Sequence, residues 1–176
     1  LDQVEQLDVE LKAVVGEQMV SDVPIGAFLS GGLDSSLIVA YMNQHRDDPV
    51  STYSIGFEKS SLGQDVIGSD VEYARNLKDH LNIDYNEIML NSDSSTILNK
   101  VVYHMDEPIA DPAAMTTYLV CKAAVKKSKV ILSGVGADEI FGGYPRYLAN
   151  SISNYYRYIP TPFKRLLEEI ILSSKV

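Results

Sequence analysis

The chain has 176 residues, of which 45% are hydrophobic and 22% charged, a composition typical of a globular domain with one sizeable core. Its formal net charge of -9 argues against a general nucleic-acid or membrane-surface binder, because such proteins present a basic face. The single cysteine, Cys121, excludes an internal disulfide and a cysteine-based metal cluster.

The ends of the chain predict that it is a piece of a longer protein. It begins at Leu1, already inside a helical pattern, and it stops at Val176 just after an apolar segment. The longest apolar runs are too short to span a bilayer, and no signal-peptide pattern is present. We therefore expect no membrane partner.

Apolar residues at helical spacing alternate along the chain with short apolar runs, which predicts alternating helices and strands. We expect helices at 4–19, 37–42, 71–81 and 115–123, with another beginning near Ile140. We expect strands at 25–29, 50–57, 85–90 and 130–132, and a loop at 59–69. The hydroxyls of Ser35 and Ser36 are expected to start the second helix, and Ser69 or Asp70 to cap the third.

This alternation indicates an α/β fold, a three-layer doubly wound parallel sheet with helices on both faces. In such sheets the ligand binds beyond the carboxyl ends of the strands. The loops that follow Leu29, Ile55 and Leu132 should therefore line the site.

The segment from Leu29 to Ser36 joins a predicted strand to a predicted helix and reads Leu-Ser-Gly-Gly-Leu-Asp-Ser-Ser. Glycines allow close approach of the backbone, serines add hydroxyls, and a helix N-terminus adds free N–H groups, so together they favour an anion such as pyrophosphate. The lysine of a Walker-type loop is missing. A carboxylate at Asp34 would repel a triphosphate unless Mg²⁺ lay between them.

A second glycine-bearing segment runs from Ser133 to Glu139 and is followed by Gly142-Gly143-Tyr144. Asp138 should lie at the same sheet edge as Asp34, and two carboxylates from different loops are a usual way to hold Mg²⁺. The alternative is that Asp138 and Glu139 only cap the helix beginning near Ile140. Arg146 could contact a phosphate or a carboxylate, or form an ion pair on a helix surface.

Ser30-Gly31-Gly32-Leu33-Asp34-Ser35 resembles the pyrophosphate (PP) loop of the N-type ATP pyrophosphatases. Combined with the segment from Ser133 to Tyr144, it resembles the synthetase domain of the glutamine-hydrolysing asparagine synthetases. Similar segments occur at 23–26, 53–57 and 106–108, and the resemblance runs from Val4 to Leu148.

The resemblance implies an adenine nucleotide alpha hydrolase-like fold, with a synthetase domain at 1–150 and the start of a C-terminal helical segment at 151–176. It implies ATP and Mg²⁺ as cofactors and a cytoplasmic location. ATP or pyrophosphate contacts are implied at Leu29, Ser30, Gly31, Gly32, Asp34, Ser35, Ser36, Ile55, Gly56, Ser133 and Gly134. Asp34, Asp138 and Glu139 are the implied catalytic residues, and Asp34 and Asp138 the implied metal ligands.

The implied reaction is ATP-dependent amide formation. A substrate carboxylate, aspartate or an analogue, is adenylated with release of pyrophosphate, and ammonia or an amine then displaces AMP. The implied partner is a glutaminase domain or subunit, which lies outside this chain, and a homodimer is left open. No nucleic-acid partner is expected.

Two departures from the family pattern keep alternatives open. The family usually carries a glutamate where this chain has Val135, which leaves the carboxylate substrate open. A lysine that the family places nearer the C-terminus has no clear counterpart. The alternatives are a catalytically silent nucleotide-binding or scaffold module and another PP-loop enzyme, such as one that adenylates a tRNA base. The acidic charge argues against RNA.

Overall fold

A computed structural model describes residues 2–57, 67–90, 97–107, 110–111, 113–160 and 163–164. The chain divides into two compact units, Leu1–Val135 and Gly136–Val176, and each is described by itself. Among the described residues, no helix is both long enough and apolar enough to cross a membrane.

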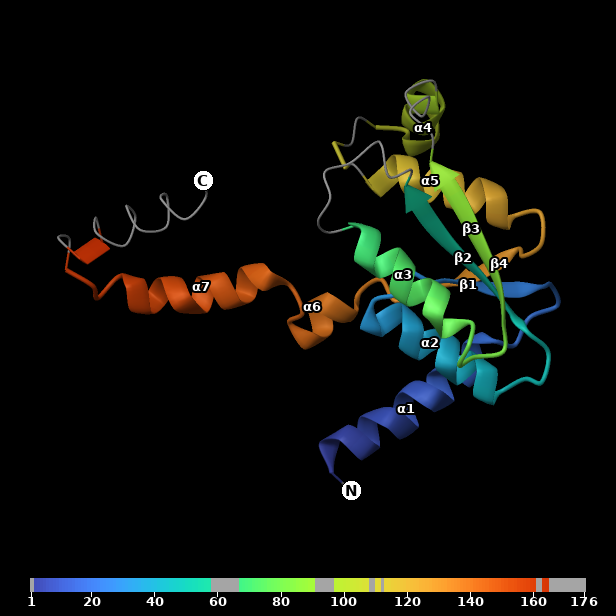
Figure 1. The fold of residues 1–176 in the computed structure, drawn as a ribbon, viewed down its shortest axis with the longest axis horizontal. Helices are drawn as coiled ribbons and strands as arrows, with labels where there is room; N and C mark the ends of the chain where they lie inside the picture. The colour runs from blue at the N-terminus through green and yellow to red at the C-terminus, as the bar shows by residue number, and fades with distance from the viewer. Residues whose placement is uncertain are drawn as a thin grey trace. The chain divides into compact units, whose positions relative to one another are not determined.

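The first unit is built on a four-stranded sheet in the order β3-β2-β1-β4 (Figure 1). Its strands are β1 (Ile25–Phe28), β2 (Val50–Phe57), β3 (Ile83–Leu90) and β4 (Val130–Leu132). All three strand pairs are parallel, so the four carboxyl ends meet at one edge. This confirms the predicted α/β fold with a parallel sheet.

Helices cover both faces of this sheet. They are α1 (Gln3–Gln18), α2 (Leu33–Gln44), α3 (Ile67–Leu77), α4 (Leu98–Met105) and α5 (Ala113–Ala124). Alternate strand residues form two cores. Ala27 and Leu29 pack with α2 on one face, whereas Phe28 and Ile131 pack with Val120 of α5 on the other.

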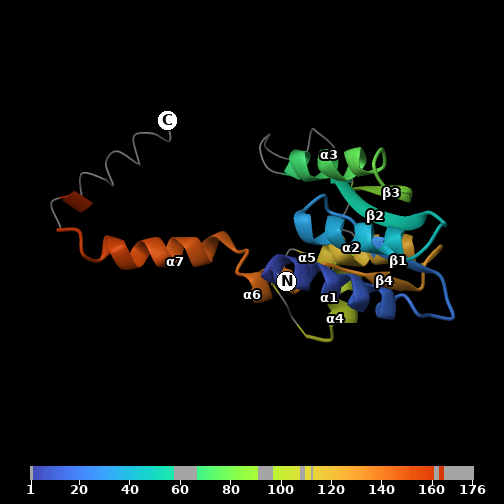
Figure 2. The same cartoon turned by 90° about the horizontal axis from the view of Figure 1, so that it is seen from below.

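Helix α1 lies beside α2, as Figures 1 and 2 both show. The hydroxyl of the buried Tyr41 donates to Asp8 at 2.7 Å. Burial is the larger cause, and this hydrogen bond the second, that raises the pKa of Tyr41 to about 12. His45 Nε2 lies 2.8 Å from the Lys12 carbonyl. These polar contacts hold α1 beside α2, and Val15 of α1 belongs to the same hydrophobic core as Ala27 and Leu29.

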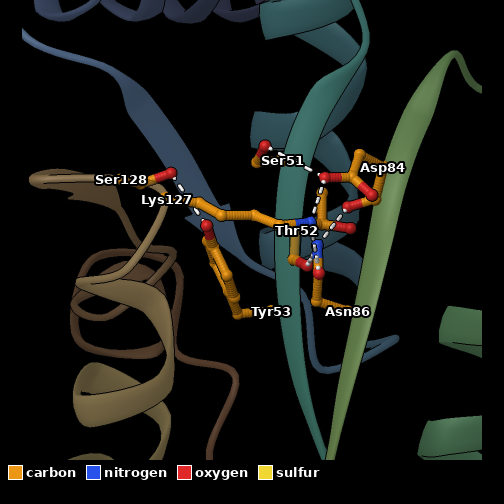
Figure 3. Close-up of polar contacts among 7 residues, drawn as sticks. All are labelled: Ser51, Thr52, Tyr53, Asp84, Asn86, Lys127 and Ser128. Carbon is orange, nitrogen blue, oxygen red and sulfur yellow. Dashed lines mark hydrogen bonds and ion pairs between the residues drawn. The ribbon is translucent and has the colours of Figure 1, made fainter.

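A polar network holds the amino ends of the strands to the turn after α5 (Figure 3). Lys127 Nζ donates to Asp84 Oδ2 and Asn86 Oδ1, each at 2.9 Å. The buried Tyr53 hydroxyl lies 2.9 Å from the Ser128 hydroxyl. The network therefore links β2, β3 and the entry to β4.

The second unit contains α6 (Ala137–Phe141) and α7 (Pro145–Tyr156). Gly136 is the N-cap of α6, and the proline at the first position of α7 suits a helix start. Helix α7 runs across residue 150, the boundary that we expected between the synthetase domain and a helical segment. The division of the whole protein into domains stays a prediction.

The strands β2 and β4 have the predicted bounds, and the other predicted elements are present with shifted ends. Two cap assignments are wrong. Helix α2 begins at Leu33, after an N-cap at Gly32, and not at the serines. Helix α3 begins at Ile67, so Ser69 and Asp70 lie inside it. The predicted loop at 59–69 otherwise falls on residues outside the described ranges. Helix α4 was not predicted, and α7 begins at Pro145, before the helical segment that was expected from residue 151.

Candidate functional site

The turn between β1 and α2 is tightly folded at the carboxyl edge of the sheet. Gly31 has φ +88°, a conformation that a residue with a side chain rarely adopts. The first helical bond is the one from Ser36 N–H to the Gly32 carbonyl, at 3.1 Å. The amides of the three preceding residues, 33–35, have no acceptor one turn earlier in the helix, so they are the ones that an anion can bind.

The serine hydroxyls brace this turn from inside. Ser35 Oγ is 2.9 Å from Ser30 Oγ, accepts from Ser30 N–H at 3.2 Å and donates to the Gly32 carbonyl at 3.2 Å. Ser36 Oγ also donates to that carbonyl, at 2.7 Å. None of these hydroxyls caps the first-turn amides, and α2 has no side-chain cap. The partial positive charge of the helix N-terminus therefore stays available to a ligand.

The turn after β4 packs directly against the start of α2. A Cβ atom added at Gly134 would lie 3.0 Å from Asp34 Cβ and 3.0 Å from the Ser35 backbone nitrogen. Ser133 Oγ accepts from the Val135 amide at 3.3 Å, which closes this turn. Asp34 and Gly134 are 100 positions apart (134 minus 34), and the structure brings the two glycine-bearing turns into contact at these residues.

A cleft of about 270 Å³ opens beside this turn, between the ends of β1 and β2 and helices α3 and α5. The described residues that line it are Phe28, Leu29, Ser30, Tyr53, Ser54, Ile55, Val71, Thr116, Thr117 and Val120. Its walls are mainly apolar, which suits a flat aromatic group, while Ser30 connects it to the anion-binding turn.

The second unit carries its own polar cluster around α6. Asp138 and Glu139 lie in the first turn of the helix, and neither is the N-cap. Tyr144 donates to Glu139 at 2.5 Å, and this bond lowers the pKa of Glu139. Arg146 stacks 4.6 Å above the Tyr144 ring. A Cβ at Gly143 would collide with the Asp138 carboxylate, so this glycine lets the carboxylate lie against the backbone.

Comparison with known proteins decides the family. The family model described as asparagine synthase matches residues 6–175, almost the whole chain. The chain belongs to the asparagine synthase family.

Individual relatives agree with this membership. Over 87% of this chain, asparagine synthetase [glutamine-hydrolyzing] 1 of Bacillus subtilis is 39% identical, and the match covers 23% of that protein. A putative asparagine synthetase [glutamine-hydrolyzing] of Mycobacterium tuberculosis is 34% identical over 94% of this chain and 24% of its own length. The chain therefore spans about a quarter of the curated relatives that it matches.

A solved structure supports the fold. The glutamine-dependent NAD+ synthetase of Acinetobacter baumannii, solved with adenosine diphosphate, matches with a TM-score of 0.56 over 82% of this chain and 28% of that one. The sequence identity is 19%, so this similarity concerns the fold alone.

Most candidate site residues lie at one sheet edge. The turn after β1 carries Leu29 to Ser36, β2 carries Ile55 and Gly56, and the turn after β4 carries Ser133 and Gly134. Asp138 and Glu139 belong to the second unit, so the pairing of Asp138 with Asp34 stays a prediction. No three Asp, Glu, His or Cys side chains form a metal-binding group within the described part of the chain.

Sequence reasoning did not find the cleft residues of α5 or Ser54. Thr116 and Thr117 reach the cleft because α5 crosses the sheet near its carboxyl edge. Nothing in a lone Thr-Thr pair signals this position. Ser54 could have been flagged, because it directly precedes Ile55 in a strand whose end was expected to line the site.

Proposed function

We propose that this chain is the ATP-pyrophosphatase part of an amide-forming ligase. The observation that supports this most strongly is the packing of Gly134 against Asp34 and Ser35, because it joins both glycine motifs beside one cleft. In the proposed reaction, a carboxylate oxygen attacks the α-phosphorus of ATP, and the bond from that phosphorus to the bridging oxygen breaks. Pyrophosphate leaves and an acyl-adenylate forms. The nitrogen of ammonia or an amine then attacks the acyl carbon, AMP leaves, and the nitrogen loses a proton.

The turn between β1 and α2 would hold the pyrophosphate. The first-turn amides of α2 point their partial positive charge at the leaving group, and the bracing of Ser30 by Ser35 fixes the turn before ligand arrives. The protein's contribution in this proposal is positioning and charge stabilisation.

The cleft would hold the adenine and ribose. Leu29 and Ile55 line it and provide backbone groups, while Val71 and Val120 provide apolar walls from α3 and α5. A cleft of about 270 Å³ is of the right order for a base rather than for a whole nucleotide, so the phosphates would extend toward Ser30.

Mg²⁺ fits the chemistry of the donors. Asp34 is a partly exposed carboxylate in the first turn of α2, and hard oxygen ligands suit this cation. In our proposal Asp34 and Asp138 would hold Mg²⁺, which neutralises phosphate charge. One or two carboxylates are enough, since phosphate oxygens and water complete the shell.

Glu139 would face the acyl-transfer step from the second unit. Its hydrogen bond from Tyr144 keeps its pKa below the usual value, so the carboxylate is ionised at neutral pH. A lowered pKa makes this carboxylate a weak base, so in our proposal its charge orients the attacking amine and the amine's proton passes to solvent. Val135 is 91% exposed where the family usually has glutamate, so the proposal leaves the carboxylate substrate open between aspartate and an analogue.

The names of the relatives support further partners. They are described as glutamine-hydrolysing synthetases, so we propose that a glutaminase domain or subunit supplies ammonia to this chain. The need for ATP favours a cytoplasmic location.

The decisive experiment measures pyrophosphate release from ATP by the purified chain. Mg²⁺, ammonium chloride and a panel of carboxylic acids that includes aspartate are supplied one acid at a time. We expect release, with AMP as co-product, that requires one acid of the panel. ATP binding without release under every condition would support the silent module. Pyrophosphate release that does not depend on the added carboxylic acid would contradict the proposed ligase activity.

A further inference from the structure

The strands β1 and β2 separate at the edge where the cleft opens. Their pairing ends at Phe28 opposite Tyr53, and one more backbone bond follows, from Leu29 N–H to the Tyr53 carbonyl at 2.9 Å. Strand β2 nevertheless continues to Phe57, paired with β3 on its other side. Ser54 and Ile55, which lie on opposite faces of the sheet, both line the cleft here. Among the described residues, no strand pairs with this part of β2 on the side of β1.

A regular parallel ladder would have added one bond at this point. After Leu29 N–H donates to Tyr53, the Leu29 carbonyl should accept the amide two residues further along β2, which is that of Ile55. The structure has a different donor. The hydroxyl of Ser54, a side chain only 3% exposed, donates to the Leu29 carbonyl. Within the described residues, no backbone bond joins Ile55 to Leu29.

Tyr85 of β3 shares the face of the sheet on which Ser54 lies, because the register pairs Ser54 with Glu87, two residues further along β3. Tyr85 donates to Glu87 at 3.5 Å, and Glu87 accepts from Arg75 of α3 at 2.8 and 2.6 Å. These contacts connect β3 to α3 beside the strand that carries Ser54.

We propose that Ser54 is a positioning residue for base recognition. By occupying the Leu29 carbonyl, its hydroxyl keeps β1 and β2 apart and leaves the N–H and C=O of Ile55 free to bind the hydrogen-bonding edge of a purine. A free N–H beside a free C=O matches adenine, which offers a ring-nitrogen acceptor next to an amino donor. This inference rests on the proposed binding of ATP in the cleft.

Without the Ser54 hydroxyl, the Leu29 carbonyl would be left unpaired unless Ile55 supplied the bond. Because a buried unpaired carbonyl is unfavourable, we expect β1 and β2 to join by one more rung, which engages the N–H of Ile55. The change would weaken recognition of the adenine edge without unfolding the sheet.

The test compares the parent chain with three variants. Ser54→Ala removes the hydroxyl, and Ser54→Thr restores one in a residue that suits strands. Ser51→Ala is the matched control, since Ser51 lies on the same strand with a 3.4 Å bond to Asp84 and does not line the cleft. Binding of ATP and of inosine triphosphate, which carries the reversed edge, is measured by calorimetry. Amide hydrogen exchange at Ile55 is followed by NMR without and with ATP.

We expect Ser54→Ala to weaken ATP binding about fivefold, the loss of one hydrogen bond, and to leave inosine triphosphate binding nearly unchanged. Ser54→Thr and Ser51→Ala should behave like the parent. Without nucleotide, the Ile55 amide should exchange freely in the parent and be protected in Ser54→Ala.

Equal losses for both nucleotides would indicate a general packing role and overturn the inference, as would a protected Ile55 amide in the nucleotide-free parent. A parent chain that binds no ATP would instead overturn the proposed function. In that event, base recognition would fall with it, whatever the exchange data show about the strands.

Discussion

The two ends of the same sheet use their polar groups in opposite ways. At the amino ends, Lys127 binds Asp84 and Asn86, and the Tyr53 hydroxyl meets that of Ser128 (Figure 3). At the carboxyl ends, the strands separate, and the serines of the β1–α2 turn bond to each other and not to the first-turn amides. At the amino ends these polar side chains bond to one another, whereas at the carboxyl ends the first-turn amides of α2 stay available to a ligand.

This difference separates stability from binding. Substitutions of Lys127, Asp84 or Asn86 should change the free energy of unfolding and leave ATP binding alone, because these residues do not line the cleft. Tyr53 belongs to this network and also lines the cleft, so its substitution should affect both. Substitutions at the carboxyl ends should mainly change binding or turnover, except where side-chain volume is added between the two turns.

Asp34→Asn should reduce Mg²⁺-dependent pyrophosphate release by about 100-fold, because it removes a charge that the metal needs. The shape of the side chain is kept and Asp34 is only partly buried, so the melting temperature should change little. Asp48→Asn, an exposed acid between α2 and β2, is the control. Unchanged release in Asp34→Asn would remove Asp34 from the site.

Gly134→Ala should destabilise the first unit by about 1–3 kcal/mol, because its new Cβ would meet Asp34 and the Ser35 backbone at 3.0 Å. Gly32→Ala is a matched comparison, because its Cβ would meet only Ser30 Oγ, at 3.4 Å, and should cost less than about 1 kcal/mol. Urea unfolding measures both. If Gly134→Ala were the milder change, the two turns would not be in contact.

The same two turns show how far sequence reasoning reaches. The alternation of strands and helices predicted that Ser30 and Ser133 share a sheet edge, because parallel strands all end on one side. The sequence could not predict that Ser54 binds Leu29, since this depends on where the neighbouring strand stops. Helix α4 was missed because it has only eight residues, too few for a clear period. The prediction that Ser35 and Ser36 start α2 is wrong because their hydroxyls donate to the Gly32 carbonyl and do not bind the first-turn amides.

Lys127→Met should lower the free energy of unfolding by only about 0.5 kcal/mol at pH 7, because Lys127 and Asp84 are 53% and 44% exposed and water screens the pair. Nucleotide binding should not change. Lys126→Met, an exposed lysine in the same turn, is the control. A loss of ATP affinity would mean that the two ends of the sheet are coupled.

The effect of Lys127→Met should also depend on pH. The hydrogen bond from Lys127 holds the pKa of Asp84 below its usual 3.8, against the opposing effect of burial. A lowered pKa in the folded state gives stability that is fully present above the unfolded pKa and is lost as pH falls through the folded pKa. The difference between parent and variant should therefore be full at pH 6 and shrink below about pH 4. A difference that grows in acid would contradict the ion pair.

Thr52→Val should have a small effect of the opposite sign. Thr52 is fully buried on β2, and in the described part of the chain its hydroxyl has no hydrogen-bond partner. Replacing an unpaired hydroxyl by a methyl group removes a desolvation cost, so the free energy of unfolding should stay constant or rise by up to about 1 kcal/mol. Tyr53→Phe, the adjacent residue, removes a hydroxyl paired with Ser128 and should instead cost about 1 kcal/mol. If both variants were destabilised equally in urea, the Thr52 hydroxyl would have a partner in solution, such as a buried water, and the amino half of the sheet would be fully satisfied.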